Sequence, residues 1–487
     1  MRPLIAILLL SSLVITGCSD SDSDNDNTAP ELGNIYPDDD HGVQSRQVWV
    51  SGDVSDEAIA SVVIESGDDS VEADIDEGQF SATINATPGN NSYRIIATDQ
   101  SGNETSYDAS FYFGARVTAG GSHTGAIVDG ATYIWGRSNK GQTGLGAITT
   151  LADNPDTHPD SPVLLGTSTP FVSLAFNQNA SIALDSSGAV WAWGDGDDGQ
   201  LGLGTAGSGM LDEEDRLVPT QITGLSGMVA VVRGYDHSMA LSNSGAVWAW
   251  GDNSVGQIGD GTEEDRDIPV MISGLSDIVM ISAGSKSSYA LDSQGNLWAW
   301  GRNSYGNLGQ GTEDSDAHSS PVQVPLPEVI VSIATGRDHV LALARSGKVY
   351  AWGLNASSQV GLHESEQWEG EIHSPLELPW FDDAVAVYAN GNQSFVERSD
   401  GKIYPWGQNG MGTLGIEVDG NVEQPGSAIF GLENVADLGV GAMHTIALRE
   451  DGNIFTWGWS FEGSLGGGES TIHRWTYRVP LLIELPE

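Results

Sequence analysis

Residues 245–270 read GAVWAWGDNSVGQIGDGTEEDRDIPV, and the parts of this segment recur along the C-terminal three quarters of the chain. A Trp-Gly pair appears seven times, at spacings of about 50 to 58 residues, and a glycine stands five residues before each tryptophan. The stretch between them alternates, as in AVWAW, which predicts a β-strand with both aromatic side chains on one face. The tryptophans of the seven pairs are Trp135, Trp193, Trp250, Trp300, Trp352, Trp406 and Trp457.

Each copy contains further strand signals around this stretch. A second strand precedes it, typified by GYDHSMALSNSG from Gly234, and a GQLGLGT-type loop follows it. A proline with another alternating stretch, as in VPTQITGL, ends the copy. Every copy therefore supplies three to four strands, and a closed ring of seven such sheets leaves no long sheet edge exposed.

The combined motif resembles the regulator of chromosome condensation repeat. Its parts are a Gly-x-x-His strand, Gly-x-Val-Trp-x-Trp-Gly and Asn-x-x-Gly-Gln-Leu-Gly, over about residues 114–487. The resemblance implies a seven-bladed β-propeller. The eukaryotic namesake is a nuclear exchange factor, an activity that we do not carry over. Bacterial propellers of the family, among them an extracellular β-lactamase inhibitor, present loops to other proteins, which implies a binding scaffold.

The N-terminus predicts export and lipidation. Residues 4–15 are apolar but too few to span a bilayer, which is typical of a signal peptide. The following Thr-Gly-Cys resembles a bacterial lipobox, which implies cleavage after residue 17, lipidation of Cys18 and, because Ser19 follows, an outer-membrane or cell-surface location. Cys18 is the only cysteine, so no disulfide forms within the chain.

The acidic segment 18–29 predicts a flexible tether, because it contains almost no apolar residue to bury. Four acids in and next to it, Asp20, Asp22, Asp24 and Glu31, occupy positions 1, 3, 5 and 12 of an EF-hand-type loop. However, Asn25 holds the glycine position and no helices flank the loop. We therefore treat calcium binding as a weak alternative and expect no metal and no cofactor.

Residues 30–113 predict a small β-sandwich. Alternating stretches such as QVWVSGDV and IASVVIES are separated by Gly, Asn and Asp turns. The segment YRIIATDQSGNET resembles the closing strands of bacterial immunoglobulin-like domains, which implies a spacer domain. The expected fold is thus all-β: an immunoglobulin-like sandwich followed by a seven-bladed propeller at residues 114–487.

The charge balance limits the possible partners. With 67 acidic and 19 basic residues, the net charge is −48, and a surface poor in Lys and Arg does not bind nucleic acid well. Acids gather in the variable loop of three copies, which predicts a negative face that docks a basic protein or cations, or that is simply solvated. They are Asp212, Glu213, Glu214 and Asp215; Glu263, Glu264 and Asp265; and Glu313, Asp314 and Asp316.

Two loops depart from the repeat length, and one of them, after Gly361, carries further candidates. Trp368 in this loop is a candidate interface anchor or a loop-packing residue. The same stretch offers a possible metal-ligating set, formed by His363, Glu366, Glu371 and His373. We consider this set only as a minor alternative to ordinary loop packing.

The sequence contains no catalytic frame such as Gly-x-Ser-x-Gly or HExxH. We therefore expect a monomeric, non-enzymatic, surface-exposed scaffold that binds an unknown, possibly basic protein through propeller-face loops. The alternative from another class is a carbohydrate-active enzyme or lectin-like glycan binder at the cell envelope, using carboxylates and exposed aromatics.

Three details of the repeat lead to structural expectations. The repeat histidine is replaced by Ala180, Ser287 and Ser394 in even-numbered copies, and we expect it to bond to backbone as a structural group. Asn177 replaces the glycine that precedes it, which predicts a left-handed turn there. The last strand, residues 479–485, is expected to pair with the first blade. The four histidines are His123, His237, His339 and His444.

Overall fold

The computed structural model describes residues 27–38, 40–56, 58–148, 159–167, 169–204, 215–362, 370–468 and 476–486. Within these ranges the chain forms strands and turns only, and the expected all-β class is confirmed. None of the described residues belongs to a helix with the length and apolar character needed to cross a membrane.

The first nine strands form two packed sheets, with strand orders β1-β3-β7-β6 and β2-β9-β8-β4-β5. Alternate residues of the long strands point inward, as in β3, where Val48, Val50 and Val54 are buried. The strands are β1 (Glu31–Tyr36), β2 (His41–Val43), β3 (Gln47–Ser55), β4 (Ile59–Ser66), β5 (Asp69–Glu72), β6 (Asp74–Asp76), β7 (Gln79–Asn85), β8 (Gly89–Asp99) and β9 (Glu104–Phe113).

The other strands form seven sheets, which we number as blades 1 to 7 in chain order. The first four blades contain β10 (Val117–Ala119), β11 (His123–Val128), β12 (Ala131–Gly136) and β13 (Val163–Leu164); β14 (Phe171–Asn177), β15 (Ala180–Asp185), β16 (Val190–Gly194) and β17 (Arg216–Gln221); β18 (Met228–Arg233), β19 (His237–Ser242), β20 (Val247–Gly251) and β21 (Arg266–Met271); and β22 (Ile278–Ala283), β23 (Ser287–Asp292), β24 (Leu297–Arg302) and β25 (Ala317–Gln323).

The last three blades contain β26 (Ile330–Thr335), β27 (His339–Ala344), β28 (Val349–Leu354) and β29 (Glu371–Glu377); β30 (Ala384–Asn390), β31 (Gln393–Arg398) and β32 (Ile403–Gly407); and β33 (Val435–Val440), β34 (His444–Arg449), β35 (Ile454–Trp459) and β36 (Thr476–Ile483). Blade 6 has three strands, and Pro405 lies in its edge strand β32, where a missing N–H costs no ladder bond.

The blades form a closed ring. The first strand of each blade contacts the first strand of the next, and β33 of blade 7 contacts β10 of blade 1. The expectation that the last strand pairs with blade 1 is wrong, because β36 pairs with β35 of its own blade. Closure instead rests on packing between blades, where Val117 and Trp135 join Ile446 and Ile483 in one apolar cluster.

The seven Trp-Gly tryptophans hold neighbouring blades together. Each side chain is fully buried, and each indole Nε1 donates a hydrogen bond of 2.8–3.0 Å to a backbone carbonyl of the preceding blade. For Trp135 the acceptor is Ser464 in blade 7, so the same contact closes the ring. The other acceptors are Gln142, Gln200, Gln257, Asn307, Gln359 and Thr413.

The repeat histidines are buried structural groups, but their partner is not the expected backbone. Each Nε2 lies 2.6–2.9 Å from a hydroxyl of the next blade. In blade 6 the residue that pairs with Gly407 is Gln393. Gln393 therefore occupies the histidine position there, and the sequence-based assignment to Ser394 is wrong by one residue. The pairs are His123 with Ser181, His237 with Ser288, His339 with Ser394, and His444 with Thr124.

The glycine before each histidine serves a different purpose from the one expected. Asn177 and Gly234 do not adopt positive φ, so the prediction of a left-handed turn is wrong. A Cβ on Gly234 would come within 2.0 Å of Cε1 of His237. Glycine is therefore required for space beside the imidazole, and asparagine fits in blade 2 because Ala180 replaces the histidine there.

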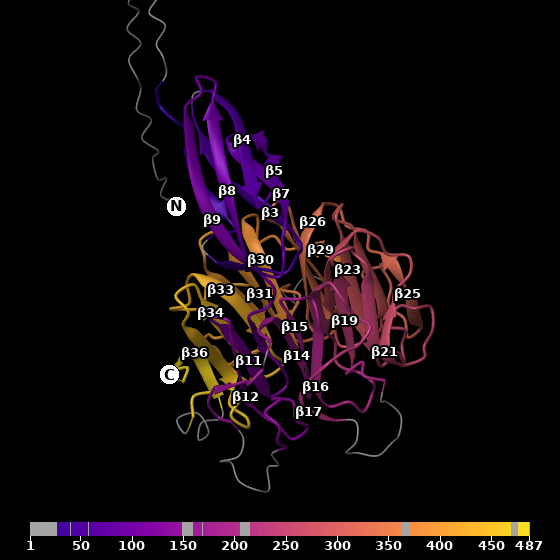
Figure 1. Ribbon diagram of the computed structural model, residues 1–487. Coiled ribbons are helices and arrows are strands. Elements are labelled where there is room, and N and C mark those ends of the chain that lie inside the picture. The colour runs from indigo at the N-terminus through magenta and orange to yellow at the C-terminus, as the bar shows by residue number, and fades with distance from the viewer. Residues whose placement is uncertain are drawn as a thin grey trace, which may run out of the picture.

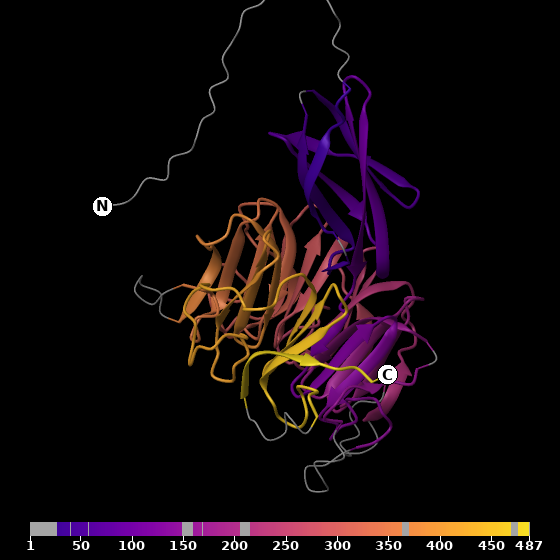
Figure 2. The same cartoon turned by 90° about the vertical axis from the view of Figure 1, so that its left-hand side faces the viewer.

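The sandwich stands on one end of the ring in both views (Figure 1 and Figure 2). Arg46 fixes the junction: its backbone N donates to the carbonyl of Val279 at 3.0 Å, and its guanidinium donates to the carbonyls of Ile278 and Asn243. Asn243 belongs to the turn between β19 and β20. The sandwich thus covers the side of the ring that carries the turns between second and third strands.

Candidate binding surfaces

The acidic loops lie on the side of the ring that the sandwich leaves open. Third strands run away from the sandwich, so the loops that follow them emerge at the opposite end. We call this side the loop face and define it by the loops at residues 252–265 and 303–316 and their equivalents in other blades. Asp215, Glu263 and Glu313 come from blades 2, 3 and 4, which are consecutive in the ring.

Some of the predicted acids hold their own loops together. Asp265 accepts a hydrogen bond from the backbone N of Asn253 at 2.8 Å. Asp314 accepts from the Asn303 amide at 3.0 Å and lies 2.8 Å from Nε2 of His318. Partial burial raises the pKa of Asp314, but these hydrogen bonds outweigh burial and keep it below its ordinary value. Because these carboxylates already form hydrogen bonds within their own loops, they contribute less to the binding of an external partner.

Other predicted acids point into solvent. The Glu264 side chain is 80% exposed, although its carboxylate lies 3.4 Å from Arg266. Glu263, Glu313 and Asp316 are also exposed. Because they come from adjacent blades on one face, their charges add to a common negative potential.

Several predicted residues lie outside the part of the chain that the structure describes. Glu31 is described and begins strand β1, where it pairs with Ser55. Its three proposed calcium partners are not described, so that alternative stays a prediction. The residues outside the described ranges are Cys18, Asp20, Asp22, Asp24, Asp212, Glu213, Glu214, His363, Glu366 and Trp368.

In the part of the chain that the structure describes, two groups of possible metal-ligating side chains lie on the loop face. In the first, Asp195, Asp197 and Asp215 surround the Nζ of Lys140 from blade 1, at 3.2–3.5 Å. The Lys140 ammonium group contacts all three carboxylates and offsets part of their charge, so the group works as an ion-pair network between blades 1 and 2. Burial lowers the pKa of Lys140, but attraction by the three carboxylates outweighs it and raises the pKa.

The second group consists of Glu313, Glu371 and His373. From the sequence, Glu371 and His373 were identified as possible metal ligands, but they were grouped with other residues of the same loop. Glu313 comes instead from the neighbouring blade, a contact for which the sequence contains no local signal. Burial and the facing Glu313 carboxylate raise the pKa of Glu371, although His373 partly opposes the shift.

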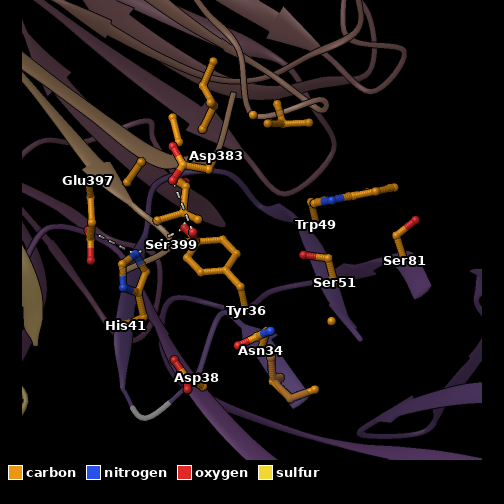
Figure 3. A pocket seen from close by; sticks show the side chains of 18 of the residues that line it. Asn34, Tyr36, Asp38, His41, Trp49, Ser51, Ser81, Asp383, Glu397 and Ser399 are labelled. Carbon is orange, nitrogen blue, oxygen red and sulfur yellow. Dashed lines mark hydrogen bonds and ion pairs between the residues drawn. The ribbon is translucent and has the colours of Figure 1, made fainter. Parts of the chain in front are cut away.

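A cleft of about 1140 Å³ lies between the sandwich and the ring. One wall is the outer face of sheet β1-β3-β7-β6, including Trp49 and Ser51, and the other is formed by the turns of blades 5 and 6, including Asp383 and Ser399 (Figure 3). The guanidinium of Arg345 stacks 4.0 Å from the centre of the Trp49 ring and connects the two walls. Sequence reasoning did not identify this cleft, because its walls are far apart in the chain.

A buried polar group joins the two walls at one end of the cleft (Figure 3). The Tyr36 hydroxyl donates to the carbonyl of Val385 at 3.0 Å, and Nε2 of His41 lies 3.9 Å from the Glu397 carboxylate. Burial raises the pKa of Glu397 to about 8 and lowers the pKa of His41 to about 4. At neutral pH both groups are therefore uncharged, which suits a junction more than an ion-pair site.

Comparisons with known proteins agree with this architecture. The RCC1-like domain family matches residues 74–379, and the regulator of chromosome condensation (RCC1) repeat matches residues 435–464. The chain is 31% identical over 315 residues to the ultraviolet-B receptor UVR8 of Arabidopsis thaliana, covering 62% of this chain and 56% of the receptor. It is 36% identical over 156 residues to Protein pim1 of Schizosaccharomyces pombe, covering 30% and 28%. The chain thus spans little more than half the length of these relatives at most.

Solved structures show the same fold. Yeast RCC1 (Prp20), solved bound to Kap60, superimposes with a TM-score of 0.64 and 22% identity, covering 76% of this chain and 85% of that chain. Human WBSCR16 gives a TM-score of 0.63 and 21% identity, covering 73% and 94%. The family match extends over more than half of the sequence and the ring of blades has the same architecture, so the chain belongs to the RCC1-like domain family.

Proposed function

We propose that this protein is a non-enzymatic scaffold that binds a positively charged protein through the loop face. The observation that carries the proposal is the division of the ring into two sides. The sandwich covers one side, while exposed acids from consecutive blades gather on the other. Glu263, Glu264, Glu313 and Asp316 are the residues that we expect to contact the partner, since they are exposed.

Relatives support a binding role in general terms. The solved structure of Prp20p from Saccharomyces cerevisiae is described together with that protein's binding properties to Gsp1p and histones. Prp20p is 25% identical over 68% of this chain, with a TM-score of 0.59. We carry over only the idea that a ring of this type presents loops to another protein, because the loops themselves vary between copies.

The location that we propose follows from the sequence. Lipidation at Cys18 would anchor the chain at the outer membrane or cell surface, with residues 18–29 as tether and the sandwich, an immunoglobulin-like domain in this proposal, as spacer. Since the sandwich stands on the side opposite the acidic loops, such an anchor would leave the loop face directed away from the membrane.

The test compares two full-length variants of equal charge. One carries E263Q, E264Q, E313Q and D316N on the loop face; the control carries E65Q, D68N, D69N and E72Q on exposed positions of the sandwich. A partner is captured from envelope extract with wild type, identified and purified, and its affinity is measured at several salt concentrations. We expect the loop-face variant to bind at least tenfold more weakly with a shallower salt dependence, and the control to bind as wild type.

Equal weakening by both variants would contradict a loop-face site and indicate a general charge effect. The glycan alternative is tested with the same proteins on a glycan array and a panel of envelope polysaccharides. Glycan binding or cleavage that the loop-face substitutions leave intact, without protein capture, would replace the scaffold proposal.

A further inference from the structure

The group formed by Glu313, Glu371 and His373 joins two blades on the loop face. Glu371 and His373 are two residues apart on β29 of blade 5, so their side chains leave the same face of the strand. Glu313 reaches them from the loop between β24 and β25 of blade 4. Gly306 of blade 4 makes this approach possible, because a Cβ there would come within 2.4 Å of Cδ2 of His373.

The distances from the imidazole to the two carboxylates are longer than those of ordinary hydrogen bonds. Nε2 of His373 lies 3.5 Å from the Glu313 carboxylate and 3.6 Å from that of Glu371, whereas N–H···O bonds span about 2.7–3.2 Å. The Nε2 atom is buried and, among the described residues, has no hydrogen-bond partner. On the same face, Nε2 of His318 lies 2.8 Å from Asp314, which is an ordinary hydrogen bond.

The same distances fit the geometry of a metal ion. Bonds of about 2.0–2.2 Å from zinc to nitrogen and carboxylate oxygen place neighbouring ligand atoms of a tetrahedron about 3.3–3.6 Å apart. The nitrogen-to-oxygen distances of 3.5 and 3.6 Å fall within or at the end of this range. The ligand atoms of all three residues lie within 4.8 Å of one another, so one ion can reach them after small side-chain adjustments.

The negative charge of the two carboxylates is not balanced by a lysine or arginine side chain among the described residues. Two carboxylates face each other here, and within the described ranges neither forms an ion pair with a lysine or arginine. The aspartate group at Lys140 differs in this respect, because the ammonium group occupies its centre. A cation bound at His373 would attract carboxylates of blades 4 and 5, as the Lys140 ammonium group attracts carboxylates between blades 1 and 2.

We propose that Glu313, Glu371 and His373 bind one zinc-class divalent transition-metal ion, which clamps blade 4 to blade 5. The imidazole nitrogen selects this class over calcium and magnesium, which take oxygen ligands. The three donors found among the described residues leave one tetrahedral position for a further donor. Since the Glu313 side chain is 49% exposed, that position is accessible to water or to a donor from another molecule. The site shares Glu313 with the proposed partner-binding surface, but zinc binding to the chain alone can be measured without a protein partner.

The test uses the full-length chain after treatment with a chelator and removal of the chelator. Zinc chloride is titrated calorimetrically into wild type, H373A, E313Q and E371Q. H318A is the matched control, since it removes a histidine from the start of strand β25 in blade 4. We expect one site per chain in wild type and in H318A. Each ligand variant should bind at least tenfold more weakly, because loss of even an outer-shell partner costs about 10- to 100-fold.

Thermal unfolding provides a second measurement on the same proteins. Zinc at about a hundredfold excess over its dissociation constant should raise the Tm of wild type and H318A by about 2–3 °C, and that of H373A by less. Equal Tm values without zinc would show that the variants fold normally. Binding that H373A does not weaken, that calcium reproduces, or that does not reach one ion per chain would overturn the proposal.

Discussion

Nε2 of His237 lies 2.9 Å from the hydroxyl oxygen of Ser288 in the next blade. That hydroxyl donates its single proton to the carbonyl of Gln257 at 2.7 Å, so the imidazole must be the donor in the contact between the two side chains. The carbonyl of Gln257 also accepts the indole N–H of Trp300 at 2.9 Å. One hydroxyl thus links a histidine of one blade to the tryptophan contact of the next.

Acid should destabilise the ring through its histidines. Burial lowers the pKa of His123 and His339 to about 3 and that of His237 and His444 to about 4, against an ordinary value of 6.5. The unfolded chain therefore binds more protons below pH 6.5, and the free energy of unfolding falls as pH falls from about 6.5 to about 4. Each histidine contributes about 1.4 kcal/mol per pH unit in that window.

Urea unfolding of wild type and of H237S, measured from pH 7 to pH 4.5, checks this dependence. The variant has a serine at this position, as blade 4 has at Ser287. Its free energy of unfolding should depend on pH with a slope that is smaller by the contribution of one proton. Identical slopes would mean that His237 does not titrate in this window.

The space beside the imidazole makes a prediction for Gly234. In G234A the new Cβ overlaps the His237 ring, and overpacking of this kind costs about 3 kcal/mol of unfolding free energy. The double variant G234A/H237A should lose less than the sum of the two single variants, because the collision with the imidazole is gone and only the contact with the Gly284 carbonyl oxygen at 2.7 Å remains. Denaturant unfolding of all three proteins measures the coupling.

G166A is the matched control for this experiment. A Cβ on Gly166 meets no atom within 4 Å, and Gly166 is not among the residues with positive φ. We expect a change within about 0.5 kcal/mol. Additive losses in the double variant would contradict the steric role of Gly234.

The two tryptophans of AVWAW should differ in energetic importance. Trp250 is fully buried and donates to the carbonyl of Gln200 at 3.0 Å, whereas Trp248 is only half-buried. W250A should lower the free energy of unfolding by about 3–5 kcal/mol, the range for a buried aromatic residue. W248A should cost clearly less, and a similar cost for both in chemical denaturation would contradict the assignment of Trp250 to the repeated frame.

Alkaline pH should weaken the junction through Glu397. Its pKa is raised to about 8 by burial, against an ordinary value of 4.5, so the folded chain holds a proton that the unfolded chain has released. The stability from this group is fully present below pH 4.5 and is lost as pH rises through about 8. His41 acts in the opposite sense between about pH 4 and 6.5, so pH 6.5 to 9 is the informative range.

The variant E397Q keeps the shape of the side chain and removes the titration. The free energy of unfolding of E397Q relative to wild type should increase by about 1.4 kcal/mol per pH unit up to about pH 8. Above that pH the difference should stay constant. A pH-independent difference for E397Q would show that Glu397 is already charged in the folded protein.

Much of the fold could be predicted because its signals are local. The alternation in AVWAW and in QVWVSGDV identified strands that the structure contains, β20 and β3, and the recurrence of Trp-Gly predicted seven sheets. The structural role of Trp250 could also be predicted, since a residue that recurs in every copy belongs to the repeated architecture. Period two and turn residues depend only on neighbours in the chain, so they can be read from one sequence.

The candidate sites were predictable only in part. Glu371 and His373 were recognised as possible ligands, but Glu313 was assigned to an acidic cluster of its own loop. The cleft at Trp49 and the buried Glu397 were missed altogether. In each case the partner lies tens or hundreds of residues away, and no periodicity connects it to the site.

The sequence by itself determined the strands, the sevenfold repeat and the position of the acids in the loop after each third strand. Tertiary structure alone decided that Gly234 makes room for His237, that blade 7 closes on blade 1 by packing, and that the sandwich covers the side opposite the acidic loops. The physical reason is that strand formation depends on local backbone and side-chain alternation, whereas these features depend on which surfaces meet when the ring closes.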